Sequence, residues 1–328
     1  MTDAWAAVVT PSGPAPELAA DDAALRHGVG AMALPRDVLE VRGRDAVAYL
    51  QGQCSQDVAA LAEGASADAL LLSPQGRLDA LVRVTRVAED GFVVDVDGGF
   101  GDAVLSRLLR FRLRVAVEVT LLPWRGVALR GPQAPELLPE LAGASGVALA
   151  LPWSWHGLEG VDLLGEAPAV PAGVRWCTTP AWEALRVEAG VPVMGAELDE
   201  RTIAAEAGLV ARTVSFTKGC YTGQELVARL DARGSNVARR LRGVVVTGPL
   251  PAGHVVPPVG TPLQVGGKAV GMLTSVAWSP ALGLPVALAY LHRSVEPPCP
   301  VELHVPDGSP SGAVAVPAEA RPLPLVAH

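Results

Sequence analysis

Short apolar runs and turn-forming residues follow one another through the first 121 residues of the chain. The apolar runs predict strands at 38–41, 67–72, 78–87, 92–96 and 115–121. Two other stretches, 43–51 and 102–110, place apolar residues at helical spacing. Helices that are mixed with hairpin-linked strands favour an α+β fold over a doubly wound parallel sheet.

The middle of the chain repeats this pattern on a smaller scale. Strands at 127–129, 147–151 and 161–164, with a helix at 135–141, indicate a second, smaller α+β lobe at about 117–180. A further helix is bounded by Thr179 as N-cap, Pro180 in the first turn and Gly190 at the far end. Glu188 lies near its C-terminus, where the helix dipole disfavours a carboxylate. It is therefore either exposed, the commoner case, or paired.

Helical patterns stop after about residue 241. Short strand-like runs at 241–246, 262–265, 269–277, 285–291 and 301–305 are separated by Gly and Pro, which is typical of a small β-barrel or sandwich. The resulting organisation is a lead-in over 1–34 with one short helix, an α+β region over 35–240, a barrel over 241–310 and a loose tail over 311–328.

Charge and hydropathy exclude several classes of function. The 328 residues carry a net charge of −8, so a broad electrostatic surface for nucleic acid or anionic lipid is not expected. Arg233, Arg239, Arg240 and Arg242 could form a local basic patch, but a solvated face beside a strand is the commoner arrangement. No run is long enough to cross a bilayer, and the first residues do not resemble a signal peptide. We expect a cytoplasmic monomer.

The four cysteines are far apart, and no His lies at a metal-ligand spacing from any of them; they are Cys54, Cys177, Cys220 and Cys299. A metal or cluster site made by this chain alone is therefore not expected. Reduced thiols in a cytosol fit this spacing better than a disulfide framework. Nucleotide-binding, serine-hydrolase and zinc-protease motifs are also missing. Asp95 and Asp97 fit a polar strand face better than an acid–base pair.

The segment Lys218–Glu225, KGCYTGQE, is the strongest candidate for a functional centre. Thr222 and Glu225 have capping-box spacing, which predicts a helix from Thr222 through Leu230. Cys220 would lie at the positive end of that helix, close to Lys218, where a thiolate is favoured. By spacing alone, a buried inert Cys in a capped turn is equally favoured. The crowding of rare residue types, including one of only two lysines, favours the reactive thiol.

The same segment resembles the YgfZ family, the folate-binding relatives of the glycine-cleavage T-protein, which is an aminomethyltransferase. The resemblance extends from about Pro35 to Val305. Four further segments carry it: YLQGQCSQDV at 49–58, LLSPQGRLDALVRV at 71–84, LRVEAGVPVMGAEL at 185–198 and VGMLTSVAWSPALGLPVALAYL at 270–291.

This resemblance implies two ferredoxin-like α+β lobes and a C-terminal antiparallel β-barrel around a central hole that takes tetrahydrofolate. It implies that Glu188 binds the pterin ring, and we expect Tyr221, Gln224 and Arg229 to contribute to folate binding. Cys220 would be the residue tied to activity, with Lys218 beside it. The motif and Glu188 are expected to face one folate pocket. The implied role is assembly or repair of iron–sulfur client proteins, which supports tRNA modification without direct contact with nucleic acid.

Two departures bear on the activity. T-proteins carry an Asp pair after the hairpin glycines, where this chain has Ala80 and Leu81, with Asp79 one residue early. Ala232 stands where the family often has an aromatic residue, so a stacking role there is not expected. Three hypotheses follow: a non-catalytic or weakly catalytic folate-dependent accessory factor for iron–sulfur proteins, a tetrahydrofolate-dependent aminomethyl or one-carbon transferase, and a binding or interaction module that has lost folate. The missing carboxylate favours the first.

Overall fold

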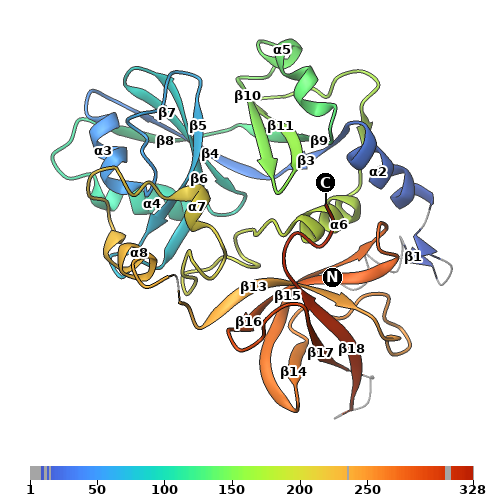
Figure 1. Cartoon of the computed structure of the whole chain (residues 1–328). Coiled ribbons are helices and arrows are strands. Elements are labelled where there is room, and N and C mark those ends of the chain that lie inside the picture. The colour runs from blue at the N-terminus through green and yellow to red at the C-terminus, as the bar shows by residue number, and fades with distance from the viewer. Residues whose placement is uncertain (1–8, 11–12, 15, 235, 307–311, 328) are drawn as a thin grey trace.

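Three units surround the centre of the molecule: two α+β lobes and, below them, a β-barrel (Figure 1). The structure is a computed structural model that describes residues 9–10, 13–14, 16–234, 236–306 and 312–327. The predicted α+β class with a C-terminal antiparallel barrel is confirmed. Among the helices of these residues, none has the length and apolar character needed to cross a membrane.

The first lobe is a five-stranded antiparallel sheet in the order β5-β6-β7-β4-β8, covered by two helices. Its strands are β4 (Arg36–Arg42), β5 (Ser66–Leu72), β6 (Leu78–Ala88), β7 (Gly91–Asp97) and β8 (Glu118–Leu122), and its helices are α3 (Ala46–Gln53) and α4 (Gly101–Phe111). The β5–β6 register shifts near the hairpin, where Leu72 pairs with Leu78 but Leu71 pairs with Ala80. Asp79 is therefore the extra residue of a β-bulge, and bulges redirect the side chains that they contain.

The second lobe is also five-stranded, in the order β10-β11-β9-β3-β12. Its strands are β3 (Gly30–Leu34), β9 (Arg125–Arg130), β10 (Leu149–Trp155), β11 (Leu158–Gly165) and β12 (Arg175–Trp176), with the helical segments η1 (Ala134–Leu137) and α5 (Leu138–Leu141) beside them. The predicted bounds of the smaller lobe, 117–180, differ from this sheet in two strands. They leave out β3, which pairs with β9, and they include β8, which belongs to the first sheet.

The N-terminal segment is more ordered than a lead-in. The short strands β1 (Val9–Thr10) and β2 (Gly13–Pro14) pair with each other, and the predicted short helix is α2 (Pro16–His27). The expectation of an irregular segment is wrong for residues 30–34, which form β3. Residues 1–8 lie outside the described residues.

The barrel is closed, in the order β13-β16-β15-β14-β17-β18. Its strands are β13 (Arg239–Val246), β14 (Pro262–Val265), β15 (Lys268–Ser279), β16 (Leu284–His292), β17 (Cys299–Pro306) and β18 (Ala313–Arg321). All five predicted strands are present. The prediction of a loose tail after residue 310 is wrong for β18, which pairs with both β13 and β17 and so closes the barrel.

Helix α6 (Thr179–Ala189) lies at the centre, between the second lobe and the barrel (Figure 1). The residue at the N-cap is Thr178, one before the predicted Thr179, and its hydroxyl donates to Asp21 of α2 instead of capping the helix. Gly190 ends α6 with φ of 72°, a left-handed conformation that favours glycine. Two short helices follow, α7 (Val210–Thr213) and α8 (Gln224–Asp231), on the side of the first lobe.

Candidate functional site

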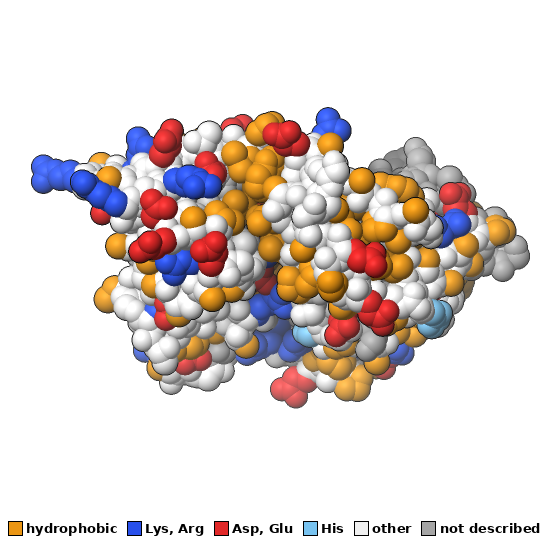
Figure 2. All heavy atoms as spheres, turned by 90° about the horizontal axis from the view of Figure 1, so that it is seen from above, with side chains coloured by type: hydrophobic (Ala, Val, Ile, Leu, Met, Phe, Trp, Pro, Cys, Tyr) orange, Lys and Arg blue, Asp and Glu red, His pale blue; other side chains and the backbone are white. Residues whose placement is uncertain are grey.

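A cavity of about 820 Å³ lies between the two lobes and α6. Five of the seven tryptophans of the chain line it: Trp124, Trp153, Trp155, Trp176 and Trp182. Four arginines also line it, namely Arg36, Arg83, Arg125 and Arg130. Seen from above, basic side chains gather in a hollow between the two halves of the molecule (Figure 2). A concave, aromatic-rich cavity with a few charged groups is the usual form of a small-molecule site.

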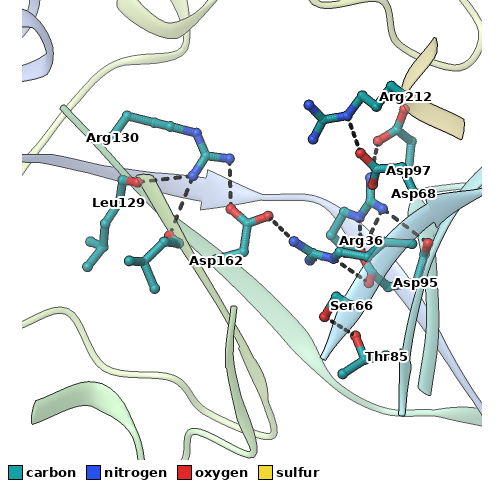
Figure 3. A network of polar contacts seen from close by, with 12 residues as sticks. Arg36, Ser66, Asp68, Thr85, Asp95, Asp97, Leu129, Arg130, Asp162 and Arg212 are labelled. Atoms are coloured by element: carbon teal, nitrogen blue, oxygen red, sulfur yellow. Dashed lines mark hydrogen bonds and ion pairs between the residues drawn. The ribbon is translucent and has the colours of Figure 1, made fainter. Parts of the chain in front are cut away.

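A chain of buried ion pairs crosses from one lobe to the other at this cavity (Figure 3). Asp95 of β7 accepts from Arg36 at 2.7 Å and from Arg83 Nε at 2.9 Å. Arg83 Nη1 lies 2.7 Å from Asp162 Oδ2 on β11, and Asp162 Oδ1 lies 2.7 Å from Arg130 Nη2. Asp95 was predicted to lie on a polar strand face, but it is fully buried. The ion pairs that continue from it connect the first lobe to the second.

The neighbouring opposite charges favour the ionised form of Asp162 in this row of ion pairs. Burial alone would raise the pKa of Asp162, but the guanidinium groups of Arg130 and Arg83 lower it below its ordinary value. Burial lowers the pKa of Arg130, and Asp162 offsets only part of that effect. Arg130 also lies over two cavity tryptophans, with its guanidinium carbon 3.9 Å from the ring centre of Trp153 and 5.4 Å from that of Trp182.

Each carboxylate that lines the cavity is bound by at least one arginine. Asp68 accepts from Arg212, Asp97 from Arg36, Asp162 from Arg83 and Arg130, and Glu183 from Arg186. Asp79 lies outside the lining and accepts from Arg107 of α4, because the bulge turns it toward that helix. Ala80 is buried and carries no polar group. The described lining therefore contains no carboxylate without an arginine partner.

Two lining residues carry buried N–H groups without an acceptor among the described residues. These are Nε of Arg130 and Nε1 of Trp155. Buried donors in folded proteins are nearly always hydrogen-bonded. A ligand with carbonyl or carboxylate oxygens would satisfy both donors.

The KGCYTGQE loop packs on the first lobe, away from the cavity lining. Nζ of Lys218 donates to three backbone carbonyls, those of Gln51 and Cys54 at 2.6 Å and that of Gln56 at 3.0 Å. An ammonium has three N–H groups, so all of its donors are used. Gln51 lies in the last turn of α3, where carbonyls lack partners within the helix and a cation is favoured. Lys218 therefore fastens the loop to the end of α3.

Helix α8 begins after Gly223, not at Thr222. Gly223 has φ of 81°, and a Cβ on it would lie 2.5 Å from the carbonyl oxygen of Ser73 in the β5–β6 hairpin. The predicted capping box is wrong, because the Thr222 side chain makes no capping bond; instead the Tyr221 N–H donates to Oε1 of Gln224. The predicted helix itself is confirmed.

Cys220 is the only cysteine with an exposed side chain among the described residues, and the nearby Phe216 is 53% exposed. Cys54 behaves differently: burial raises the pKa of its thiol to about 12, despite the positive charge of Lys218. Cys220 is therefore not the buried, inert cysteine that the spacing also allowed; Cys54 has that character.

None of the six residues predicted for the site lines the cavity. Glu188 is fully buried and accepts from Arg26 of α2, so the commoner expectation of an exposed Glu is wrong. Burial raises the pKa of Glu188, and Arg26 opposes this. The prediction that the motif and Glu188 face one pocket is also wrong for this cavity. Whether Cys220, Lys218, Glu188, Tyr221, Gln224 and Arg229 act in function stays a prediction.

Comparison with known proteins places the chain in a family. The GCVT N-terminal domain matches residues 15–157, and the glycine cleavage T-protein C-terminal barrel domain matches residues 239–322. An aminomethyltransferase of Rubrobacter xylanophilus is 31% identical over 282 residues, which cover 78% of this chain and 73% of that protein. The chain belongs to the glycine cleavage T-protein superfamily.

Members of this superfamily bind tetrahydrofolate. The tRNA-modifying protein YgfZ of Enterobacter sp. strain 638 is also 31% identical, over 216 residues that cover 60% of this chain and 65% of that protein. Sequence identity therefore assigns the chain to the superfamily but does not distinguish aminomethyltransferases from YgfZ proteins. The crystal structure of glycine cleavage system aminomethyltransferase T from Bartonella henselae has the same fold, with a TM-score of 0.77 over 97% of this chain and 91% of that one, at 21% identity.

The polar lining of the cavity was missed from the sequence. Arg36, Arg83, Arg130 and Asp162 are spread over four strands, and each looks like an ordinary strand residue on its own. One signal could have indicated them: charged residues recur within otherwise apolar strands of both lobes. Charges that are buried in this way must be paired, so they mark the place where two sheets meet.

Proposed function

We propose that this chain binds a reduced folate in the cavity and serves, through Cys220, as an accessory factor in the assembly or repair of iron–sulfur proteins. The observation that carries the proposal is that the cavity and the exposed thiol of Cys220 lie at different places in the structure. The described cavity lining holds no carboxylate without an arginine partner, while the exposed thiol lies outside it, on a loop fastened by Lys218. In this role the chain supports tRNA modification indirectly; relatives named tRNA-modifying protein YgfZ are consistent with a link to that process.

The residues present fit a reduced folate. A volume of about 820 Å³ lies in the range of sites for ligands of this size. Trp153, Trp155 and Trp182 offer ring faces for a pteridine or a benzoyl group. Arg125 offers a guanidinium group for a glutamate carboxylate, and Arg130 Nε and Trp155 Nε1 are donors in need of an acceptor. When bound, such a cofactor supplies a carrier for one-carbon units.

Aminomethyl transfer is the competing function, and the name of the Rubrobacter relative favours it. It requires a group that holds or moves a proton beside the folate. The Asp pair expected from the T-protein resemblance is replaced by Ala80 and Leu81, and Asp79 is bound to Arg107. These features favour the accessory role.

Two measurements test the proposal. Because five tryptophans line the cavity, titration with 5-formyltetrahydrofolate, a stable reduced folate, should quench intrinsic fluorescence to a saturable end point. The same preparation, given tetrahydrofolate and an aminomethylated lipoyl carrier, should form methylene-tetrahydrofolate no faster than the reaction without protein. Saturable binding with no turnover supports the proposal. Turnover at ordinary enzyme rates, on the order of 1 s⁻¹ or more, would assign the chain to the transferases.

A further inference from the structure

The end of α4 and the residues that follow it form an exposed surface of alternating apolar and basic side chains. Residues 109–114, the basic segment, have the sequence LRFRLR, and no carboxylate interrupts them. Leu109 is 40% exposed and Leu113 is 76% exposed. Lys and Arg side chains project from the end of the molecule that holds the first lobe (Figure 2). The arginines of the basic segment are all exposed; they are Arg110, Arg112 and Arg114.

The fold does not use these arginines as ion-pair partners. Arg112 donates to the Val117 carbonyl at 3.0 Å, and within the described residues none of the three pairs with a carboxylate. The preceding Arg107 differs, because it is buried and pairs with Asp79. The dipole of α4 favours a cation at Arg110, in the last helical turn, but the other two arginines follow the end of the helix. Their charges are therefore available to a partner.

The loop after α4 is fixed to the start of α3. Arg114 has φ of 57°, a left-handed conformation that is uncommon outside glycine. Two residues later the Ala116 N–H donates to Oδ2 of Asp45 at 2.7 Å, and the Asp45 N–H donates to the Ala116 carbonyl at 3.4 Å. A surface that is already ordered in this way loses little conformational entropy when a partner binds.

Helix α3 connects the basic segment to the Cys220 loop. It lies beside α4, where Tyr49 Oη donates to the Leu108 carbonyl at 2.6 Å (Figure 1). The basic segment leads to its first residues, and Lys218 binds its last turn. The eight residues of α3 span about 12 Å. Because a standard interface covers about 800 Å² on each partner, one protein can contact both the basic segment and Cys220.

We propose that the basic segment is the docking site for an acidic surface of the iron–sulfur client protein, and that docking places this client against Cys220. The inference rests on the proposed accessory function. Unpaired guanidinium groups bind carboxylates through two parallel hydrogen bonds, so the complementary surface carries Asp or Glu side chains. Leu113 lies between two of the arginines, and an apolar side chain of the client would cover it. Interfaces are enriched in such arginines.

The surrounding charges favour a protein over a membrane or a nucleic acid. Asp45 is hydrogen-bonded to the loop that follows the basic segment, Glu118 comes directly after that loop, and the chain as a whole has a net charge of −8. A uniformly anionic bilayer or polynucleotide would meet these carboxylates as well as the arginines. A protein surface, in contrast, can place its carboxylates opposite the arginines alone.

The test measures association between the full chain and the purified apo form of the iron–sulfur enzyme whose activity is followed in rescue of a strain that lacks this gene. Raising the salt concentration from about 0.05 M to about 0.5 M should slow wild-type association about tenfold or more. The triple variant Arg110→Gln, Arg112→Gln, Arg114→Gln should associate about tenfold more slowly at low salt and lose most of the salt dependence. Leu113→Gln should mainly raise the dissociation rate.

A matched control removes three positive charges from the barrel. Lys268→Gln, Arg293→Gln and Arg321→Gln, combined, change the net charge equally and should leave association and rescue at wild-type values. Both triple variants should keep the thermal unfolding temperature and the saturable quenching by 5-formyltetrahydrofolate, because all six side chains lie outside the cavity lining. In cells, the triple variant of the basic segment should restore about fivefold less enzyme activity or lower, in line with slower association.

The outcomes are distinguishable. No association in the wild type, or equal association and rescue by the two triple variants, refutes docking at the basic segment; the proposed function stands as long as Cys220→Ser fails to rescue. Full rescue by Cys220→Ser overturns the proposed function. Binding to phosphatidylglycerol vesicles or to a random-sequence RNA that is lost in the triple variant of the basic segment would assign the arginines to that polyanion and overturn the protein partner.

Discussion

Lys218 should contribute to stability and to the placement of Cys220 rather than to proton transfer, and Lys218→Met tests this directly. The substitution keeps most of the aliphatic chain and removes the ammonium. Three carbonyls, those of Gln51, Cys54 and Gln56, then lose their shared donor at the end of α3. Lys268 provides a matched control, because it is the only other lysine in the chain and is exposed at the start of β15.

The expected magnitude follows from these contacts. A hydrogen bond to a charged group contributes about 1.5–3 kcal/mol, so three of them in a dry core would contribute about 5–9 kcal/mol. Lys218 is only half-buried, and water can reach carbonyls that the ammonium leaves. With that screening we expect Lys218→Met to cost about 2–3 kcal/mol. Lys218→Arg should also be destabilising, because a planar guanidinium cannot direct N–H groups at three converging carbonyls.

Hydrogen exchange measured by mass spectrometry is the suitable assay, since it reports local opening. Lys218→Met should speed exchange of peptides over 51–56 and 215–223 by about 30- to 150-fold, the equivalent of 2–3 kcal/mol. The barrel should not change. Exchange as slow as in the wild type, or an equal effect of Lys268→Met, would refute the account of Lys218 as the fastening of this loop.

Three further predictions concern the buried charges and one turn. Because Arg130 and Arg83 lower the pKa of Asp162 below 3.8, its ionised form stabilises the fold above about pH 4, and this contribution is lost as the pH falls through the lowered value. The difference in unfolding free energy between wild type and Asp162→Asn should therefore shrink below about pH 4, and a difference independent of pH would contradict the pairing. Arg26→Met leaves Glu188 buried without its cation and should cost about 3 kcal/mol or more in urea unfolding; an effect on folate affinity with unchanged stability would instead support the predicted pterin role of Glu188. Gly190→Ala should cost about 1–2 kcal/mol in thermal unfolding, since φ is 72° and the new Cβ would lie 2.8 Å from Leu323; unchanged stability would show that the turn at the end of α6 can rearrange.

Local patterns in the sequence predicted the local elements well. The hairpin of β5 and β6, the helix α6 and five barrel strands follow from alternation, helical spacing and the positions of Gly and Pro. Strand β3 was missed because its partner β9 is far along the chain. Strand β18 pairs with the preceding strand β17 as well as with the distant β13, and it was missed although one of its partners is near. Nothing local identifies them as strands, and Gly and Pro around both favour irregular structure.

The candidate site was predicted only in part. The KGCYTGQE segment could be found because eight informative residues are contiguous. Its local geometry could not, since Gly223 takes a left-handed conformation imposed by the packing of α8 on the β5–β6 hairpin. Helix α6 could be predicted from the sequence, and Glu188 was therefore predicted to bind the ligand. The sequence did not show that Glu188 faces α2, where it accepts a hydrogen bond from Arg26. Asp162 and Arg130 lie on neighbouring strands of the second lobe, and Arg83 of the first lobe joins them only when the two lobes pack.

The most direct test of the central claim is rescue of a strain that lacks its own copy of this gene, with the activity of an iron–sulfur enzyme in the extract as the readout. Cys220→Ser should fold and bind 5-formyltetrahydrofolate like the wild type but restore no activity. Cys299→Ser, at a half-buried thiol in the barrel, should rescue fully. Full rescue by Cys220→Ser would contradict the claim that the exposed thiol of this loop carries the function.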